Sequence, residues 1–192
     1  MQLKNLQSSF VGKNNFFYET IDSTQKEIWR RIEKSNIEDG TLIFADIQNS
    51  GIGTHGRMWY TDEKDNIAFS IYVAMNCDLE NLKGLTQKIA EIIVQIIEEK
   101  YHIKLSINEP NDIYFNNKKI GGILTETKVY SNKVKHLVVG IGLNTNKTIF
   151  PKDIEDVATS IKKEFGIEII NEDFILEFCN RFEKEIMIRR NL

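Results

Sequence analysis

Residues 105–145 read LSINEPNDIYFNNKKIGGILTETKVYSNKVKHLVVGIGLNT, and their pattern decides the fold class. Three strand-like runs, 105–115, 118–130 and 135–145, are separated by Asn116-Asn117 and by residues 131–133. Asparagine enters the left-handed backbone region with less strain than most residues, so Asn116-Asn117 predicts a tight hairpin turn. The stretch therefore predicts antiparallel strands.

The flanking segments add helices and further strands to this run. Apolar periodicity predicts buried strands at 41–45 and 68–74, and helices at 24–35, 79–101, 153–164 and 171–189. Asp22-Ser23-Thr24 is a suitable N-terminal cap for the first helix. This order predicts an α+β fold, with a mixed, largely antiparallel β-sheet covered by helices.

Composition limits the class of protein. The chain has 192 residues, 41% of them hydrophobic and 28% charged, which predicts one globular domain over 1–192. A net charge of −3 argues against a dedicated DNA binder, because phosphate neutralisation needs a basic surplus. Cys77 and Cys179 lack metal-type spacing. With neither a signal-peptide core nor an apolar membrane span, the sequence predicts a cytoplasmic protein with free thiols.

A glycine-rich loop follows the β-rich run 41–48. Gly51-Ile52-Gly53-Thr54-His55-Gly56 has the spacing G-x-G-x-x-G, and Arg57 and Trp59 come directly after it. A dinucleotide-binding fold needs a helix that begins inside this motif, whereas residues 58–62 resemble strand or loop. We therefore expect a loop that closes over a ligand in another type of fold.

The hairpin at Asn116-Asn117 predicts a specific geometry. A two-residue turn pairs Tyr114 with Lys119 and Asp112 with Gly121, so that these four residues share one sheet face. Asp112 and Lys119 are then diagonal neighbours, roughly 7–8 Å apart. Such a face suits an anionic ligand bound close to the backbone. The alternative is a solvated surface ion pair.

The run 138–144 shows a similar arrangement. Alternation places Gly140, Gly142 and Asn144 on one face and apolar side chains on the other. Glycine inside a strand often marks the close approach of a ligand or of another backbone. We expect either a flat ligand on this face or a helix packed over small residues.

Four sequence blocks together resemble the catalytic domain of biotin protein ligases, within the wider biotin/lipoate ligase family. In the order of the family they are Ile21–Gln25, Ala45–Trp59, Pro110–Tyr114 with Lys118–Glu126, and Val139–Asn146. Each block alone is weak, but the ordered set is specific and spans most of the chain. The implied fold is that of class II aminoacyl-tRNA synthetases and biotin ligases.

The resemblance implies a two-step reaction. Biotin and Mg²⁺-ATP give biotinyl-5′-AMP and pyrophosphate, and a lysine of the biotin carboxyl carrier protein of acetyl-CoA carboxylase then accepts the biotinyl group. Adenylation supplies the carboxylate with a good leaving group, so the enzyme mainly positions reactants and stabilises charge. ATP and Mg²⁺ are the implied cofactors, with Mg²⁺ carried by ATP rather than held in a dedicated protein site.

The family motifs assign roles residue by residue. The implied catalytic residues are Lys119, Asp112 and Arg57. The implied biotin site comprises Ser23, Thr24, Gln25, Gln48, Gly51, Ile52, Gly53, Thr54, Lys119 and Gly140. The implied nucleotide site comprises Gly56, Arg57, Trp59, Asn111, Asp112, Gly142 and Asn144.

The sequence departs from the family in two places. The family loop reads G-R-G-R-x-G-R, whereas Ile52 and Thr54 stand where two arginines are expected. The Lys-Trp pair that usually precedes Pro-Asn-Asp is Asn108-Glu109. Both changes remove positive charge near the expected triphosphate and put ATP affinity and adenylate retention in doubt.

Two alternatives stay open. One is a lipoate or octanoate ligase or transferase of the same fold, and the other is a non-catalytic biotin- or nucleotide-binding module. We expect no N-terminal DNA-binding domain, no C-terminal β-barrel domain and no membrane partner. Family members often dimerise through a sheet edge, so a homodimer is compatible with the resemblance.

Overall fold

A seven-stranded sheet forms the centre of the computed structural model, which describes residues 3, 5–61, 64–108 and 110–190. The strands are β1 (Asn15–Ile21), β2 (Leu42–Gln48), β3 (Ile67–Cys77), β4 (Ser106–Asn108), β5 (Asp112–Phe115), β6 (Lys118–Tyr130) and β7 (Lys133–Leu143). Their order is β1-β2-β3-β7-β6-β5-β4, with β1 and β2 parallel and the other pairs antiparallel. The predicted mixed, largely antiparallel sheet is confirmed.

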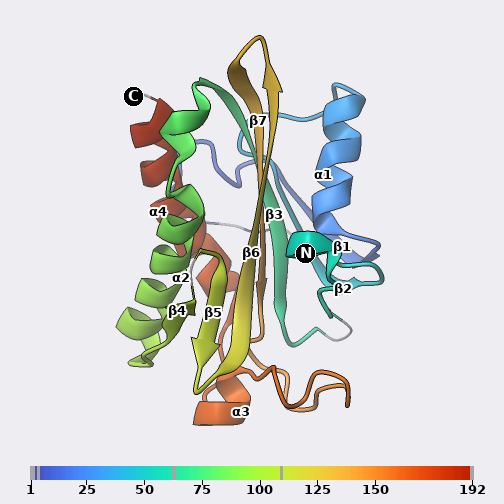
Figure 1. The fold of residues 1–192 in the computed structure, drawn as a ribbon, viewed down its shortest axis with the longest axis vertical. Helices are drawn as coiled ribbons and strands as arrows, with labels where there is room; N and C mark the ends of the chain where they lie inside the picture. The colour runs from blue at the N-terminus through green and yellow to red at the C-terminus, as the bar shows by residue number, and fades with distance from the viewer. Residues whose placement is uncertain (1–2, 4, 62–63, 109, 191–192) are drawn as a thin grey trace.

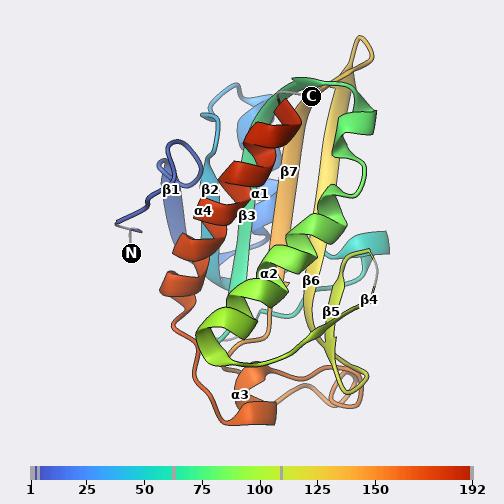
Figure 2. The same cartoon turned by 90° about the vertical axis from the view of Figure 1, so that its left-hand side faces the viewer.

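Helices cover both faces of the sheet. Helix α1 (Thr24–Glu33) packs on one face, and α2 (Leu85–Tyr101) and α4 (Asn171–Arg190) pack on the other (Figures 1 and 2). The larger core lies beneath α2 and α4 and includes the buried isoleucines of α2. A smaller cluster around Ile28, Ile43 and Val138 lies beneath α1.

Several predicted boundaries were wrong. The helix expected over 79–101 is divided into a 3-10 turn, η2 (Leu79–Leu82), and α2, because Gly84 adopts a positive φ of 73°. The run 105–115 forms two antiparallel strands, β4 and β5, rather than one. Strand β1 was not predicted.

The helix expected over 153–164 is reduced to α3 (Ile161–Phe165). The preceding residues pair with the sheet instead: the amide of Lys119 donates to Val157 O at 2.8 Å, and the amide of Thr159 donates to Lys119 O at 2.9 Å. These backbone bonds replace the helical ones and bring the segment beside Lys119.

The hairpin between β5 and β6 confirms the predicted turn but corrects its register. Asn116 and Asn117 both have positive φ, and Tyr114 pairs with Lys119. Ile113 then pairs with Gly121, which leaves Ile120 as a β-bulge, and Asp112 pairs with Gly122 rather than with Gly121 as predicted.

Because of the bulge, Gly121 and Gly122 lie on the opposite faces of the sheet from those that regular pairing predicts. A Cβ on Gly121 would lie 2.8 Å from Leu143 Cδ1, on the core side. A Cβ on Gly122 would lie 3.3 Å from Lys119 Nζ, on the opposite face. Gly122 is therefore the glycine that lies beside Asp112 and Lys119.

Candidate functional site

The hairpin brings a lysine and a carboxylate into contact. Lys119 Nζ lies 2.7 Å from Asp112 Oδ1, and both side chains are partly buried. Asn111 Nδ2 donates to the same Asp112 oxygen at 3.1 Å. The predicted proximity of Lys119 and Asp112 is confirmed. Partial burial strengthens the field of the cation, because less water screens it.

The glycine face of β7 lies next to this pair. Gly142 pairs with Gly122, and a Cβ on Gly142 would lie only 2.1 Å from Trp59 Cε2. A Cβ on Gly140 would lie 2.7 Å from Gln25 Oε1. The glycines therefore mark a close approach on this face, which the side chains of Trp59 from the loop and Gln25 from α1 make; the flat ligand expected here stays a prediction.

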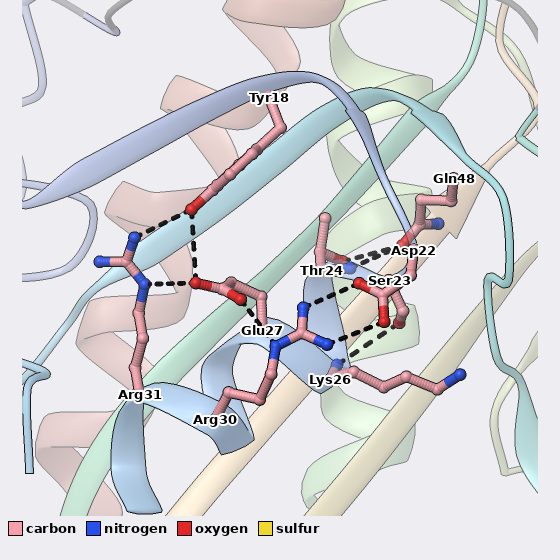
Figure 3. A network of polar contacts seen from close by, with 9 residues as sticks. All are labelled: Tyr18, Asp22, Ser23, Thr24, Lys26, Glu27, Arg30, Arg31 and Gln48. Carbon is pink, nitrogen blue, oxygen red and sulfur yellow. Dashed lines mark hydrogen bonds and ion pairs between the residues drawn. The ribbon is translucent and has the colours of Figure 1, made fainter. Parts of the chain in front are cut away.

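The N-terminus of α1 forms a polar wall of the site (Figure 3). Ser23 caps the helix by accepting a hydrogen bond from the Lys26 amide at 3.4 Å. Gln48 Oε1 accepts from the Thr24 amide at 2.8 Å, and the Thr24 hydroxyl lies 2.9 Å from Ser70 Oγ. These contacts join α1, β2 and β3.

A bidentate ion pair holds this helix end. Arg30 Nη1 and Nη2 each donate to one oxygen of Asp22 at 2.8 Å (Figure 3). Asp22 O also accepts the Ser50 amide at 2.8 Å, which connects the helix start to the glycine loop. The two hydrogen bonds from Arg30 lower the pKa of Asp22 to about 2.

The lowered pKa predicts a pH-dependent contribution to stability. The folded-state pKa of Asp22 lies below its unfolded value of 3.8. The pair therefore stabilises the fold above about pH 4, and this contribution disappears as the pH falls towards 2. Urea unfolding at pH 6, 4 and 2.5 should show that Asp22→Asn is less stable than the unaltered protein at pH 6 and nearly as much so at pH 4, with a clearly smaller difference at pH 2.5. An equal difference at all three pH values would contradict the assignment.

The glycine loop is a small hairpin. Ile52 bridges to Met58, the Gly53 amide donates to Arg57 O at 2.8 Å, and the Trp59 amide donates to Gly51 O at 2.9 Å. Consistent with the argument against a dinucleotide fold, no α-helix starts here; residues 54–56 form a single 3-10 turn, η1 (Thr54–Gly56).

Individual glycines give the loop its shape. A Cβ on Gly51 would lie 2.4 Å from Trp59 O, and Gly56 has a positive φ of 70°. Arg57 is exposed and donates to Thr54 Oγ1 at 3.2 Å, so its guanidinium folds back on the loop. His55 is exposed as well.

Two cavities meet at Trp59 and Lys119. The first is bounded by the helix end, the glycine loop and the sheet, and its walls include Ser23, Thr24, Gln25, Gln48, Ile52, Ser70, Asn111, Asp112, Gly122, Gly140 and Gly142. The second, of about 420 Å³, has walls that include Arg57, Tyr60, Tyr114, Asn144, Lys147, Phe150, Ile154 and Val157. Gly53, Thr54, Trp59 and Lys119 belong to both.

The first cavity is narrow, with a volume of about 40 Å³. Ligand sites usually measure roughly 300–1,000 Å³. The Trp59 indole lies directly on Gly142, and its Nε1 is buried without a hydrogen-bond partner among the described residues. A ligand of ordinary size therefore requires this indole to move.

This packing predicts the result of adding one methyl group. Gly142→Ala would place a Cβ 2.1 Å from the indole, so Trp59 must leave its position. In a Trp29→Phe background Trp59 is the sole tryptophan, and we expect its fluorescence emission to shift to the red. Gly53→Ala is the control, because its Cβ would approach other atoms no closer than 3.5 Å. Unchanged emission in Gly142→Ala would refute the contact.

The sequence motifs identified the first cavity better than the second. Lys147 and Phe150 were missed, as were the apolar residues around 154–158. They follow the last strand and reach the site only because their segment pairs with Lys119. Asn111 and Asp112, which were assigned to the nucleotide, line the first cavity.

Within the part of the chain that the structure describes, no cluster of three or more His, Cys, Asp or Glu side chains could hold a metal ion. None of the described helices has the length and apolar character needed to cross a bilayer. Cys77 and Cys179 are unpaired and buried. Glu109, one of the two departures before Pro110, lies outside the described residues, and Asn108 is exposed on β4.

Proteins of known function are similar to this chain in sequence. The chain is 33% identical over 181 residues to the bifunctional ligase/repressor BirA of Bacillus subtilis, covering 93% of this chain and 55% of BirA. It is 24% identical over 143 residues to the biotin–[acetyl-CoA-carboxylase] ligase of Mycobacterium tuberculosis, covering 72% of this chain and 51% of that protein. The chain thus spans about half the length of these curated relatives.

A solved structure shares the fold as well. The biotin protein ligase from Aquifex aeolicus in complex with biotin and ATP superposes with a TM-score of 0.75 and 29% identity, covering 93% of this chain and 72% of that one. A model of the biotin/lipoate A/B protein ligase family matches residues 17–144, which include the helix end, the glycine loop, the Lys119 hairpin and the glycine face. The chain belongs to this family.

Proposed function

We propose that the protein is an ATP-dependent biotin ligase. It forms biotinyl-5′-AMP and transfers the biotinyl group to a lysine of the biotin carboxyl carrier protein of acetyl-CoA carboxylase. The observation that carries this proposal is the meeting of two cavities at Lys119 and Trp59. A reaction that joins two substrates needs two adjoining sites with the reacting atoms at their junction.

The first cavity has the chemistry of a biotin site. Ser23, Thr24, Gln25 and Gln48 gather at one end, where they suit the donors and acceptor of a ureido ring. Ile123 and Leu124 add apolar walls, which suit the hydrocarbon part of the molecule. Along β7 the site begins at Gly140, beside Gln25, and ends at Gly142. Gly142 pairs with Gly122, which lies beside Lys119. A carboxylate at the far end of the ligand would therefore reach the Lys119 cation.

The second cavity suits a nucleotide. Trp59, Tyr60 and Phe150 supply aromatic surface, and Arg57, Lys119 and Lys147 supply cations along the walls. Asn144 adds an amide that is held by Asn66 and Thr159. Mg²⁺ bound to ATP would neutralise part of the triphosphate charge.

The residues around the junction account for the chemistry. In the first step a carboxylate oxygen of biotin forms a bond to the α-phosphorus, and the bond to pyrophosphate breaks. Lys119 stabilises the negative charge that gathers there, and Asp112 fixes its position. In the second step the carrier amine attacks the acyl carbon and AMP leaves.

The solved relative that holds biotin and ATP supports both substrates. The replacement of the loop arginines by Ile52 and Thr54 leaves Arg57 as the loop's remaining arginine, and Arg57 is turned towards Thr54. We therefore propose weaker ATP binding than in members that keep the arginines. A cytoplasmic location also forms part of the proposal and agrees with the two unpaired cysteines.

One assay with parallel mixtures tests the function. The protein is mixed with biotin, ATP and Mg²⁺, with and without carrier protein, while pyrophosphate release and carrier mass are followed. We expect pyrophosphate in both mixtures and a biotinylated carrier in the second. Biotin binding without pyrophosphate release would indicate a binding module. A parallel mixture contains lipoate in place of biotin. A carrier that is lipoylated there but is not biotinylated with biotin would indicate the lipoate alternative.

A further inference from the structure

A carboxylate next to the first cavity contacts one of the residues that line it. Glu126 lies on β6, two residues after Leu124 of the cavity wall and on the same face of the sheet, and its Oε2 accepts a hydrogen bond from Gln25 Nε2 at 2.9 Å. The same oxygen accepts from Trp29 Nε1 at 2.6 Å. Gln25 and Trp29 both belong to α1. Glu126 therefore connects the central sheet to the helix that supplies the polar end of the site.

The chemistry of the carboxylate decides which way the Gln25 amide points. An ionised carboxylate can only accept hydrogen bonds, so the NH₂ group of Gln25 must face Glu126. The amide oxygen is then turned towards Gly140, where a Cβ would lie 2.7 Å from it. The orientation of this amide is thus determined by its partner.

The amide oxygen is buried and has no hydrogen-bond partner among the described residues. A buried acceptor without a partner costs free energy, roughly 1–3 kcal/mol in typical cases. Gln25 lines the first cavity together with Gly140. An N–H group of a ligand on this face can supply the missing bond.

We propose that Glu126 is a positioning residue for ligand recognition, because it holds Gln25 Oε1 as an acceptor for a ureido N–H. Without Glu126 the Gln25 amide can rotate and present its NH₂ group, which repels the ligand N–H. Glu126 thereby selects ligands that donate a hydrogen bond at this point. This inference rests on the proposed biotin-binding function.

The test measures biotin affinity by titration calorimetry in single and double variants. Glu126→Leu keeps a side chain of similar size and removes the acceptor. We expect its Kd for biotin to rise about tenfold or more, which is the usual effect of losing one buried hydrogen bond. Glu126→Gln keeps an acceptor oxygen and should stay within about threefold of the unaltered protein. Glu99→Leu, which removes an exposed carboxylate on α2, should leave the Kd unchanged.

The double variant separates positioning from general structural damage. In a Gln25→Ala background there is no amide to orient, so adding Glu126→Leu should change the Kd less than about twofold. An unchanged Kd in Glu126→Leu alone would overturn the inference, as would an equal increase with and without Gln25. If the unaltered protein binds no biotin, the proposed function fails and the inference fails with it.

Discussion

Replacing Lys119 with alanine is expected to slow the formation of pyrophosphate from biotin and ATP by about 10²–10³-fold. This is the usual effect of removing one group that stabilises developing charge in an active site. Lys119 Nζ lies 2.7 Å from Asp112 and 5.8 Å from the centre of the Trp59 ring, where the two cavities join. In the proposed reaction, an alanine there would remove the cation that lies where the two cavities meet.

The neighbouring lysine provides a matched control. Lys118 is in the same hairpin, but its Nζ donates to Glu155 O at 3.0 Å on the surface. Lys118→Ala should therefore keep normal single-turnover rates. Circular dichroism of both variants checks that the fold is retained. A Lys119→Ala variant that adenylates biotin at the normal rate would remove Lys119 from the reaction.

Replacing Phe178 with alanine is expected to lower the free energy of unfolding by about 3–5 kcal/mol, as for other fully buried phenylalanines. Phe178 lies on α4 and is completely buried. Its ring stacks on Phe182 with a centroid distance of 5.5 Å and meets Phe69 of β3 edge-on at 5.4 Å. Alanine would leave a cavity between helix and sheet that such close packing cannot readily fill.

Denaturant unfolding gives the measurement, and the same helix gives the control. Ile188 also lies on α4, but it is 59% exposed, so Ile188→Ala should change stability by no more than about 0.5 kcal/mol. A loss below about 1 kcal/mol in Phe178→Ala would show that the aromatic stack contributes little. Phe69 also borders the first cavity, so the core beneath α4 supports one wall of the site.

The sequence alone determined the features that depend on residues close to one another along the chain. The alternation in β7, the left-handed turn at Asn116-Asn117 and the glycine face at 140 and 142 all follow from local periodicity and backbone preference. The same local information paired Tyr114 with Lys119, because a two-residue turn leaves little freedom in the pairing next to it.

Only the tertiary structure decided the features that depend on distant contacts. The bulge at Ile120 exchanged the faces of Gly121 and Gly122, because the extra residue lets both Ile120 and Ile123 be buried in the same core. Gln25 and Glu126 are 101 residues apart, and their hydrogen bond forms only when α1 packs on the sheet. The walls of the second cavity after β7 likewise depend on the backbone of Lys119. Local patterns carry no information on such long-range pairings, since many partners are compatible with the same sequence and packing selects one.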